Sequence, residues 1–340
     1  MTRLLNATAR AAALIAYLLA HGPVAHAQTA PAVISGSPRV FTLGTQGGPI
    51  RISSRAQPAN AVVVGDRIYL VDAGNGVARQ LWLAGLDYRR VQQIFITHNH
   101  DDHNADWGTL MGLQWTTGRR TPINVYGPKG TESMLQGFLR YFEPNAQIRA
   151  GDRAGDARMS VPPEAVFKAH DINEGGMVFQ DERVKVTATE VCHFHFNPSA
   201  MPEGGPHKSF AFRFETHDKV IVFSGDTGVC ASMTDFARGA DLLVHEVISL
   251  PLMTERMHKL LDSQPDKPLP GVFESLMRHM AEDHTTPEDI GRLAKAAGVK
   301  KVVLTHFVPG GDNDPDSAYV DGVKKYFDGP VVAAKDLMEF

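Results

Sequence analysis

The chain has 340 residues, of which 43% are hydrophobic and 21% are charged, and its formal net charge is −4. This length is enough for one large core, and the two cysteines, Cys192 and Cys230, are too few for a disulfide scaffold, although a single bridge between them is left open. The slight excess of acidic side chains gives no electrostatic attraction for nucleic-acid phosphates, so we expect no nucleic-acid partner.

Residues 1–27 have the pattern of a cleavable signal peptide. Two arginines accompany a short apolar run, and Ala25 and Ala27 place small residues before a cleavage point. The apolar run is too short to cross a bilayer, so the mature chain would carry no membrane anchor. We therefore expect a mature chain of residues 28–340 in the periplasm or outside the cell, with an uncleaved anchor as the alternative.

The first half of the mature chain alternates predicted strands and helices. Strands are expected at 41–49, 61–64, 68–72, 91–96 and 123–126, and helices at 77–84 and 131–141. Gly65 and Asp66 predict a tight hairpin turn between the second and third strands. The segment 143–181 has weak periodicity, and we expect an insertion there.

The second half repeats this alternation. Strands are expected at 184–191, 210–215, 220–223, 241–245 and 302–304, and a helix at 287–297. Thr285 or Thr286 can cap this helix and Gly298 can end it. The methionine-rich segment 251–283 is expected to form, with the insertion, a mobile cover over a cleft. Alternating strands and helices in two similar halves predict an α/β sandwich with the functional site between its sheets.

Residues 97–106, directly after a predicted strand, hold the densest group of metal-ligating side chains. His98 and His100 are two residues apart, so both can reach one metal ion if the extended geometry persists. Asp102 and His103 follow in the turn and can bind a second ion. Imidazole and carboxylate ligands suit zinc, and also manganese or iron. The alternative interpretation is a histidine-rich surface loop.

Further candidate ligands follow three later strands. His193 comes after 184–191, Asp226 after 220–223, and His306 after 302–304. Polar residues at strand ends in α/β folds converge on one edge, so these side chains can meet the first group in space.

Taken together, these motifs resemble the metallo-β-lactamase superfamily, whose marker His-x-His-x-Asp-His precedes another histidine, an aspartate and a histidine. Several segments are similar to the ribonuclease Z branch in particular: 43–45, 71–74, 126–128, 224–227, 245–246 and 304–307. The resemblance covers nearly the whole mature chain. It implies an α/β fold of the αββα sandwich type, with the metal site at the rim between two β-sheets.

The resemblance also assigns ligands to two zinc ions. One ion would be held by His98, His100 and His193, and the other by Asp102, His103 and His306, with Asp226 bridging both. His195 also precedes an aromatic residue, as the family ligand does. Glu190, the acidic residue three positions before His193, favours His193 as the ligand.

Other residues match the acid machinery of that branch. Glu246 corresponds to its glutamate and His284 to its partner histidine, so a carboxylate would orient an imidazole that protonates the leaving group. The alternative is that they form only an ion pair beside a helix. Asp72 is expected to orient a ligand histidine.

The resulting hypothesis is an exported dinuclear zinc hydrolase. A metal-bridging hydroxide, oriented by Asp102 and Asp226, would cleave a small ester, with a phosphodiester as the favoured substrate. A lactone, β-lactam or sulfate ester is the alternative substrate, and a diiron redox protein is the alternative class. Segment 143–181 lacks the basic, glycine-rich arm of ribonuclease Z, which argues for a small-molecule substrate rather than tRNA. A homodimer remains open.

Overall fold

The computed structural model describes residues 37–48, 53–195, 205–263 and 271–340. The predicted signal peptide, residues 1–27, lies outside the described residues and stays a prediction. Among the helices that are described, none combines the length and the hydropathy needed to cross a membrane.

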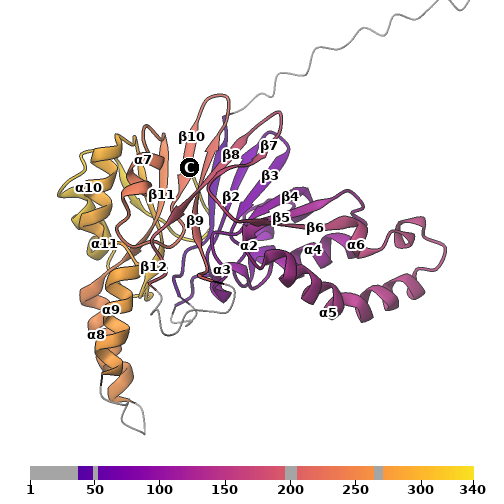
Figure 1. Ribbon diagram of the computed structural model, residues 1–340, viewed down its shortest axis with the longest axis horizontal. Helices are drawn as coiled ribbons and strands as arrows, with labels where there is room; N and C mark the ends of the chain where they lie inside the picture. Colours follow the sequence, from indigo (N-terminus) through magenta and orange to yellow (C-terminus); the bar gives the residue numbers. More distant parts are fainter. Residues whose placement is uncertain (1–36, 49–52, 196–204, 264–270) are drawn as a thin grey trace, which may run out of the picture. The chain divides into compact units, whose positions relative to one another are not determined.

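The described strands form two seven-stranded sheets (Figure 1). In spatial order, the first sheet contains β14 (Met338–Glu339), β1 (Arg39–Gly44), β2 (Ala59–Val64), β3 (Arg67–Val71), β4 (Val91–Phe95), β5 (Ile123–Pro128) and β6 (Phe167–Ile172). The second contains β13 (Val331–Ala333), β12 (Val302–Val308), β11 (Leu242–Ile248), β10 (Val220–Phe223), β9 (Ser209–Glu215), β8 (Lys185–Val191) and β7 (Gly176–Gln180).

The two sheets have the same internal plan. In the first, β1, β2 and β3 pair antiparallel and β3 to β6 pair parallel. In the second, β7 to β10 pair antiparallel and β10 to β13 pair parallel. The two similar halves expected from the sequence are therefore present.

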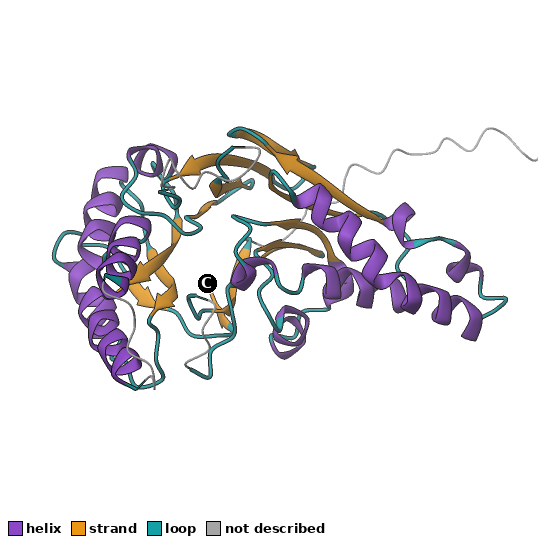
Figure 2. Cartoon of the chain, turned by 60° about the horizontal axis from the view of Figure 1, so that its bottom comes forward, coloured by secondary structure: helices purple, strands orange, loops and turns teal. Residues whose placement is uncertain are grey.

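Helices lie on the outer sides of the sheets, and the strands lie between them (Figure 2). Associated with the first half are α2 (Val77–Leu83), the 3-10 helix η1 (Tyr88–Arg90), α3 (Asp101–Asn104), α4 (Trp107–Thr116), α5 (Thr131–Asp152), the 3-10 helix η2 (Ala157–Ser160) and α6 (Pro163–Val166). Associated with the second are α7 (Ala231–Phe236), α8 (Leu250–Asp262), α9 (Val272–Asp283), α10 (Pro287–Ala297) and α11 (Ser317–Lys324).

Side-chain alternation along the strands builds this layered core. On β3, Ile68 and Leu70 pack toward α2 and α4, whereas Tyr69 and Val71 pack between the sheets. A residue period of two sends successive side chains to opposite faces, so one strand serves two layers. Phe95 of β4 fills the middle, with its ring 5.4 Å from that of Phe214 on β9. The predicted αββα sandwich is confirmed.

The segment 143–181 differs from the expected insertion, whereas the mobile cover expected at 251–283 stays a prediction. Within 143–181, β6 and β7 are edge strands of the two sheets. Helix α5 continues through Pro144 to Asp152, because Ala146 and Ala150 pack against the core and hold its second half in place. Within 251–283, α8 and α9 lie side by side as a helical hairpin (Figure 1).

Helix α10 follows the sequence closely. It spans Pro287–Ala297, the side chain of Thr286 accepts a hydrogen bond from the amide of Asp289, and Gly298 ends the helix with a φ of 62°. The cap is therefore Thr286 rather than Thr285, whose side chain bonds elsewhere, as described below.

Candidate metal centre

The seven predicted ligands come from four loops and strand ends of the two sheets. Two of them follow β4, and two more lie in the single turn of α3. One follows β8, one follows β10, and one lies within β12: in chain order the set is His98, His100, Asp102, His103, His193, Asp226 and His306.

His306 reaches the centre through an irregularity in β12. The pairing of β11 with β12 shifts so that Glu246 lies opposite Thr305 and Val247 opposite Phe307, leaving His306 as an extra residue. His306 has a φ of 45°, an uncommon value for a residue with a side chain. A β-bulge of this kind redirects a side chain, and here it turns the imidazole toward the cluster.

One part of the cluster is made of three histidines. The Nδ1 atom of His100 lies 3.0 Å from Nε2 of His98 and 3.2 Å from Nε2 of His193. The potential ligand atoms of these three residues all lie within 4.8 Å of one another, a spacing that suits a shared cation. His98 and His100 both lie after β4, which ends at Phe95, and the backbone of His100 is extended, with a φ of −67° and a ψ of 148°.

The other part is made of two histidines and two carboxylates. Oδ2 of Asp226 lies 3.0 Å from Nε2 of His306 and 3.3 Å from Nε2 of His103. The same oxygen lies 3.9 Å from Nε2 of His193, and Oδ2 of Asp102 lies 3.6 Å from Nε2 of both His103 and His306. Asp226 therefore stands between the two parts.

The chemistry of this cluster fits metal ions. Oδ2 of Asp102, Nε2 of His103, Oδ1 of Asp226 and Nε2 of His306 are buried and make no hydrogen bond of normal geometry. Unsatisfied buried polar atoms are costly unless something binds them, and three of these, from Asp102, His103 and His306, lie close together. Their imidazole and carboxylate donors fit zinc, manganese or iron.

The charges of the cluster agree with a cation at its centre. Burial lowers the pKa of His193 to about 3, so this imidazole is neutral, as a metal ligand must be. Burial also disfavours a charged His306, but the contacts of this imidazole with Asp226 and Asp102 together outweigh burial and raise the pKa of His306 to about 10. The two carboxylates therefore attract positive charge into the space between them.

Asp72 orients His103, as the sequence predicted. Nδ1 of His103 donates to Oδ2 of Asp72 at 2.9 Å, which leaves Nε2 facing the cluster. The carboxylate of Asp72 also accepts from the backbone amide of Thr97 at 2.8 Å and from its hydroxyl at 3.1 Å. These contacts fix the ring and its tautomer.

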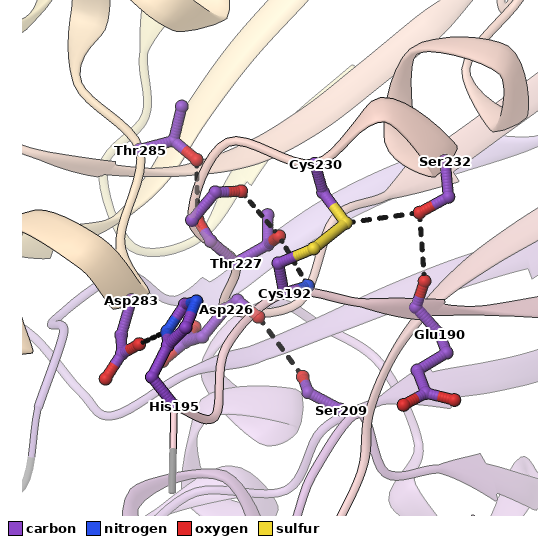
Figure 3. The surroundings of a disulfide bond; sticks show 11 residues. Glu190, Cys192, His195, Ser209, Asp226, Thr227, Cys230, Ser232, Asp283 and Thr285 are labelled. Atoms are coloured by element: carbon purple, nitrogen blue, oxygen red, sulfur yellow. Dashed lines mark hydrogen bonds and ion pairs between the residues drawn. A yellow bond between two sulfur atoms is a disulfide. The ribbon is translucent and has the colours of Figure 1, made fainter. Parts of the chain in front are cut away.

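Asp283 performs the equivalent task for His193, and sequence reasoning missed it. Nδ1 of His193 donates to the backbone carbonyl of Asp283 at 2.9 Å. The carboxylate of Asp283 binds His195 (Figure 3) and also His279, one turn earlier on α9. The side chain of His195 is 49% exposed, so the structure places His193 in the cluster and His195 at its edge. Glu190 forms a surface ion pair with Lys208.

Glu246 and His284 lie together beside the cluster. Nδ1 of His284 is 3.3 Å from Oε2 of Glu246, and Oε1 of Glu246 accepts from the backbone amide of Thr285 at 2.9 Å. Burial disfavours the charged imidazole, but Glu246 outweighs burial and raises the pKa of His284. The potential ligand atoms of His284, His193 and Asp226 lie within 4.8 Å of one another. The geometry thus places a polarised imidazole at the wall of the centre.

Comparisons with known proteins identify the family and the fold of the chain. The family model of the beta-lactamase superfamily domain matches residues 67–307. A ribonuclease Z of Mycobacterium sp. (strain KMS) is 29% identical over 272 residues, which cover 79% of this chain and 84% of the relative. The fold is shared with the metallo-beta-lactamase fold protein YhfI of Bacillus subtilis, with a TM-score of 0.63, 19% identity and coverage of 89% and 98%. It is also shared with the short form of human tRNase Z, with a TM-score of 0.60, 22% identity and coverage of 89% and 98%.

These comparisons contradict the expectation that nucleic acid plays no part. The curated relatives that match most of the chain are ribonucleases Z, which act on RNA. The expectation failed because net charge is an average over the whole surface, whereas a few local groups and bound cations can contact a phosphodiester. Segment 143–181 lacks the basic arm of ribonuclease Z, but such an arm is only one way of binding RNA.

The family and its relatives also settle the general kind of protein. The matched region runs from β3 to β12 and contains every predicted ligand. The relatives that match it are hydrolases. The chain belongs to the beta-lactamase superfamily and is a metallo-β-lactamase-fold hydrolase related to ribonuclease Z.

Proposed function

We propose that this protein is a phosphodiesterase that works with two divalent metal ions, zinc being the favoured metal. The main support for the proposal is the position of Asp226 between the two parts of the cluster. Its Oδ2 atom lies within 3.9 Å of histidine nitrogens from both parts of the cluster, as a residue shared by two ions must. Each part also has three further donors of its own, so neither depends on Asp226 alone.

The residues of the chain divide the chemical work. Two bound cations would supply an activated water near neutral pH and a Lewis acid for an oxygen of the electrophile. Asp102 and Asp226 would orient that water through their carboxylate oxygens, both of which line the cluster. The surrounding imidazoles are buried, except that of His100, which is exposed. This burial keeps bulk water away from the cluster and strengthens the electrostatic contacts of its side chains.

His284 would donate a proton to the leaving oxygen. It lies at the wall of the cluster, and Glu246 holds its Nδ1 atom, so its Nε2 atom is the one left to meet a substrate. Glu246 is itself held by the amides of Thr285 and Thr227, which fixes the orientation of the pair. A positioned acid of this kind is worth about 100-fold or more in rate when the leaving group is poor.

RNA belongs among the candidate substrates. Ribonuclease Z is the name of the relatives that match most of the chain, and RNA is a phosphodiester. A small phosphodiester would use the same metal-centred chemistry. We therefore propose phosphodiester hydrolysis as the reaction, and an assay of small phosphodiesters beside RNA distinguishes the two sizes of substrate.

We also propose that the protein is exported. The support is the signal-peptide pattern of residues 1–27 and the disulfide between Cys192 and Cys230, since disulfides persist in oxidising compartments. The test is fractionation of cells that express the full chain, followed by N-terminal sequencing. Export predicts that the recovered protein begins at Gln28, whereas an intact N-terminus in the cytosolic fraction would contradict it.

The function is tested by metal analysis combined with a substrate panel. Purified protein should contain close to two equivalents of metal and hydrolyse bis-p-nitrophenyl phosphate, and a precursor tRNA and a short RNA should be assayed beside a lactone and a cephalosporin. Asp226→Ala should lose both bound metal and turnover. Asp101→Ala is the matched control, because Asp101 is an exposed carboxylate in the same turn as Asp102 and outside the cluster. Full activity after complete removal of metal would refute the proposal.

A further inference from the structure

A single disulfide joins the two loops of the second sheet that carry metal-centre residues. Cys192 follows β8 and directly precedes His193, and Cys230 follows the loop that carries Asp226. The bridge closes a sequence separation of 38 residues, with the two Cα atoms 5.6 Å apart (Figure 3). It is the only covalent link between these loops other than the main chain.

The two loops also meet through hydrogen bonds near the bridge. The amide of Gly228 donates to the carbonyl of Cys192 at 2.8 Å, and the amide of Cys192 donates to the hydroxyl of Thr227 at 3.2 Å. The hydroxyl of Thr285 donates to the carbonyl of Thr227 at 2.5 Å. A side chain at position 228 would overlap the carbonyl of Glu282. The loops are thus packed backbone to backbone.

His193 depends on these contacts because it lies outside regular secondary structure. Strand β8 ends at Val191, and the described residues after it, Cys192 to His195, belong to no strand or helix. The ring of His193 is held by the carbonyl of Asp283, and its backbone is held through the neighbouring Cys192. The disulfide therefore limits how far His193 can move from Asp226.

A pocket lies beside the bridge. Cys230 lines a pocket of about 230 Å³ beside α10, together with Gly228, Thr234 and Leu293. A dithiol entering this pocket would attack one sulfur atom as a thiolate and break the S–S bond, giving a mixed disulfide. Its second thiol would then displace the protein sulfur, leaving two cysteine thiols and an oxidised cyclic dithiol.

We propose that the Cys192–Cys230 disulfide is a positioning element of the metal centre, and that the oxidised protein binds metal more tightly than the reduced protein. This inference rests on the proposed metal-dependent function. The bridge touches no substrate and acts through the spacing of His193 and Asp226. Loss of groups that position a metal ligand typically lowers metal affinity about 10- to 100-fold, and we expect a change in that range.

The experiment measures metal affinity rather than turnover. Zn²⁺ binding to the oxidised protein, the dithiol-reduced protein and the Cys192→Ser/Cys230→Ser variant is followed by competition with a chromogenic chelator. The Co²⁺ absorption spectrum reports the geometry of the ligands, and far-UV circular dichroism reports the fold. Ser232→Ala is the matched control, because its hydroxyl lies 3.2 Å from the sulfur of Cys230 but is not part of the bridge. Dithiol treatment of the double variant controls for metal binding by the reductant itself.

The outcomes separate this inference from the proposed function. Weaker binding and an altered Co²⁺ spectrum in both the reduced protein and the double variant, with Ser232→Ala unchanged, support the inference. Equal affinity of the oxidised and reduced proteins would overturn it while leaving the metal-dependent function intact. If the double variant does not fold, the reduced wild-type protein alone decides. No metal binding by the oxidised protein would overturn both proposals.

Discussion

Asp72 allows the backbone and the side chain of one residue to be tested separately. Its φ of 60° lies in the left-handed region, where Gly and Asn are tolerated and Ala is strained. Its buried carboxylate accepts hydrogen bonds from the amide and hydroxyl of Thr97 and from Nδ1 of His103. Substituting Ala, Gly or Asn therefore removes different parts of its contribution.

The magnitudes follow from these contacts. Asp72→Ala should cost about 1–2 kcal/mol of backbone strain and about 1–3 kcal/mol for the buried Thr97 amide left without an acceptor, or about 2–5 kcal/mol in all. Asp72→Gly avoids the strain and should cost only the second part. Asp72→Asn keeps the backbone and can still accept from Thr97 with its one oxygen, so it should cost about 1–2 kcal/mol.

Two assays separate stability from metal binding. Urea unfolding of the chelator-treated variants gives the free energy of unfolding, for which we expect the order wild type, Asn, Gly and Ala. Zinc competition then measures affinity. Asp72→Asn should bind zinc about 10- to 100-fold more weakly, because its amide cannot both accept from Thr97 and hold the ring of His103. Wild-type affinity in Asp72→Asn would show that Asp72 does not orient His103, whatever its effect on stability.

Three further predictions concern the residues around the centre. His284→Ala should slow the hydrolysis of substrates with poor leaving groups by about 100-fold, because these need a proton donor. Hydrolysis of p-nitrophenyl esters should slow far less, and the metal content should not change. Equal slowing of both kinds of substrate would argue against His284 as a proton donor. In chelator, Cys192→Ser/Cys230→Ser should lower the free energy of unfolding by about 4 kcal/mol, because the bridge closes a loop of 38 residues and so restricts the unfolded chain. A loss below 1 kcal/mol in urea unfolding would contradict this. Gly228→Ala should cost about 1–3 kcal/mol and weaken zinc binding, because its methyl group would overlap the carbonyl of Glu282; an unchanged melting temperature would show that the loops can separate at little cost.

The sequence predicted which side chains gather in the cluster because the candidate ligands follow simple rules. His98, His100, Asp102 and His103 stand together directly after a strand, and such a density of donor side chains is itself informative. The strand-end rule also selected His193 and Asp226. The same rule selected His306, which the structure brings into the cluster, but His306 lies within β12 at a bulge rather than after the strand. A bulge depends on the pairing with β11, which the sequence of β12 alone does not contain.

The features that sequence reasoning missed depend on tertiary contacts. β6 reads Phe-Lys-Ala-His-Asp-Ile, without a clear apolar alternation, because it is an edge strand with half-exposed side chains. Its six-residue register with β5 sets its place in the sheet. Asp283 and His279 gain their roles only when α9 brings them to the metal centre. The sequence did place Asp283 directly before His284, and this was the one local signal of its importance.

The distribution of the ligands explains why the two sheets must dock before the centre exists. Four of the seven candidate ligands belong to the first half of the chain and three to the second, so neither half alone brings the whole set together. The docking itself depends on apolar packing between the sheets, where Phe95 of the first sheet contacts Phe212 and Phe214 of the second. That packing buries its aromatic area with or without metal. The disulfide, by contrast, lies wholly within the second half. It can fix His193 relative to Asp226 but cannot bring either of them to His98, so its effect on the metal centre is limited to the spacing of these two ligands, and the core brings the two sheets together.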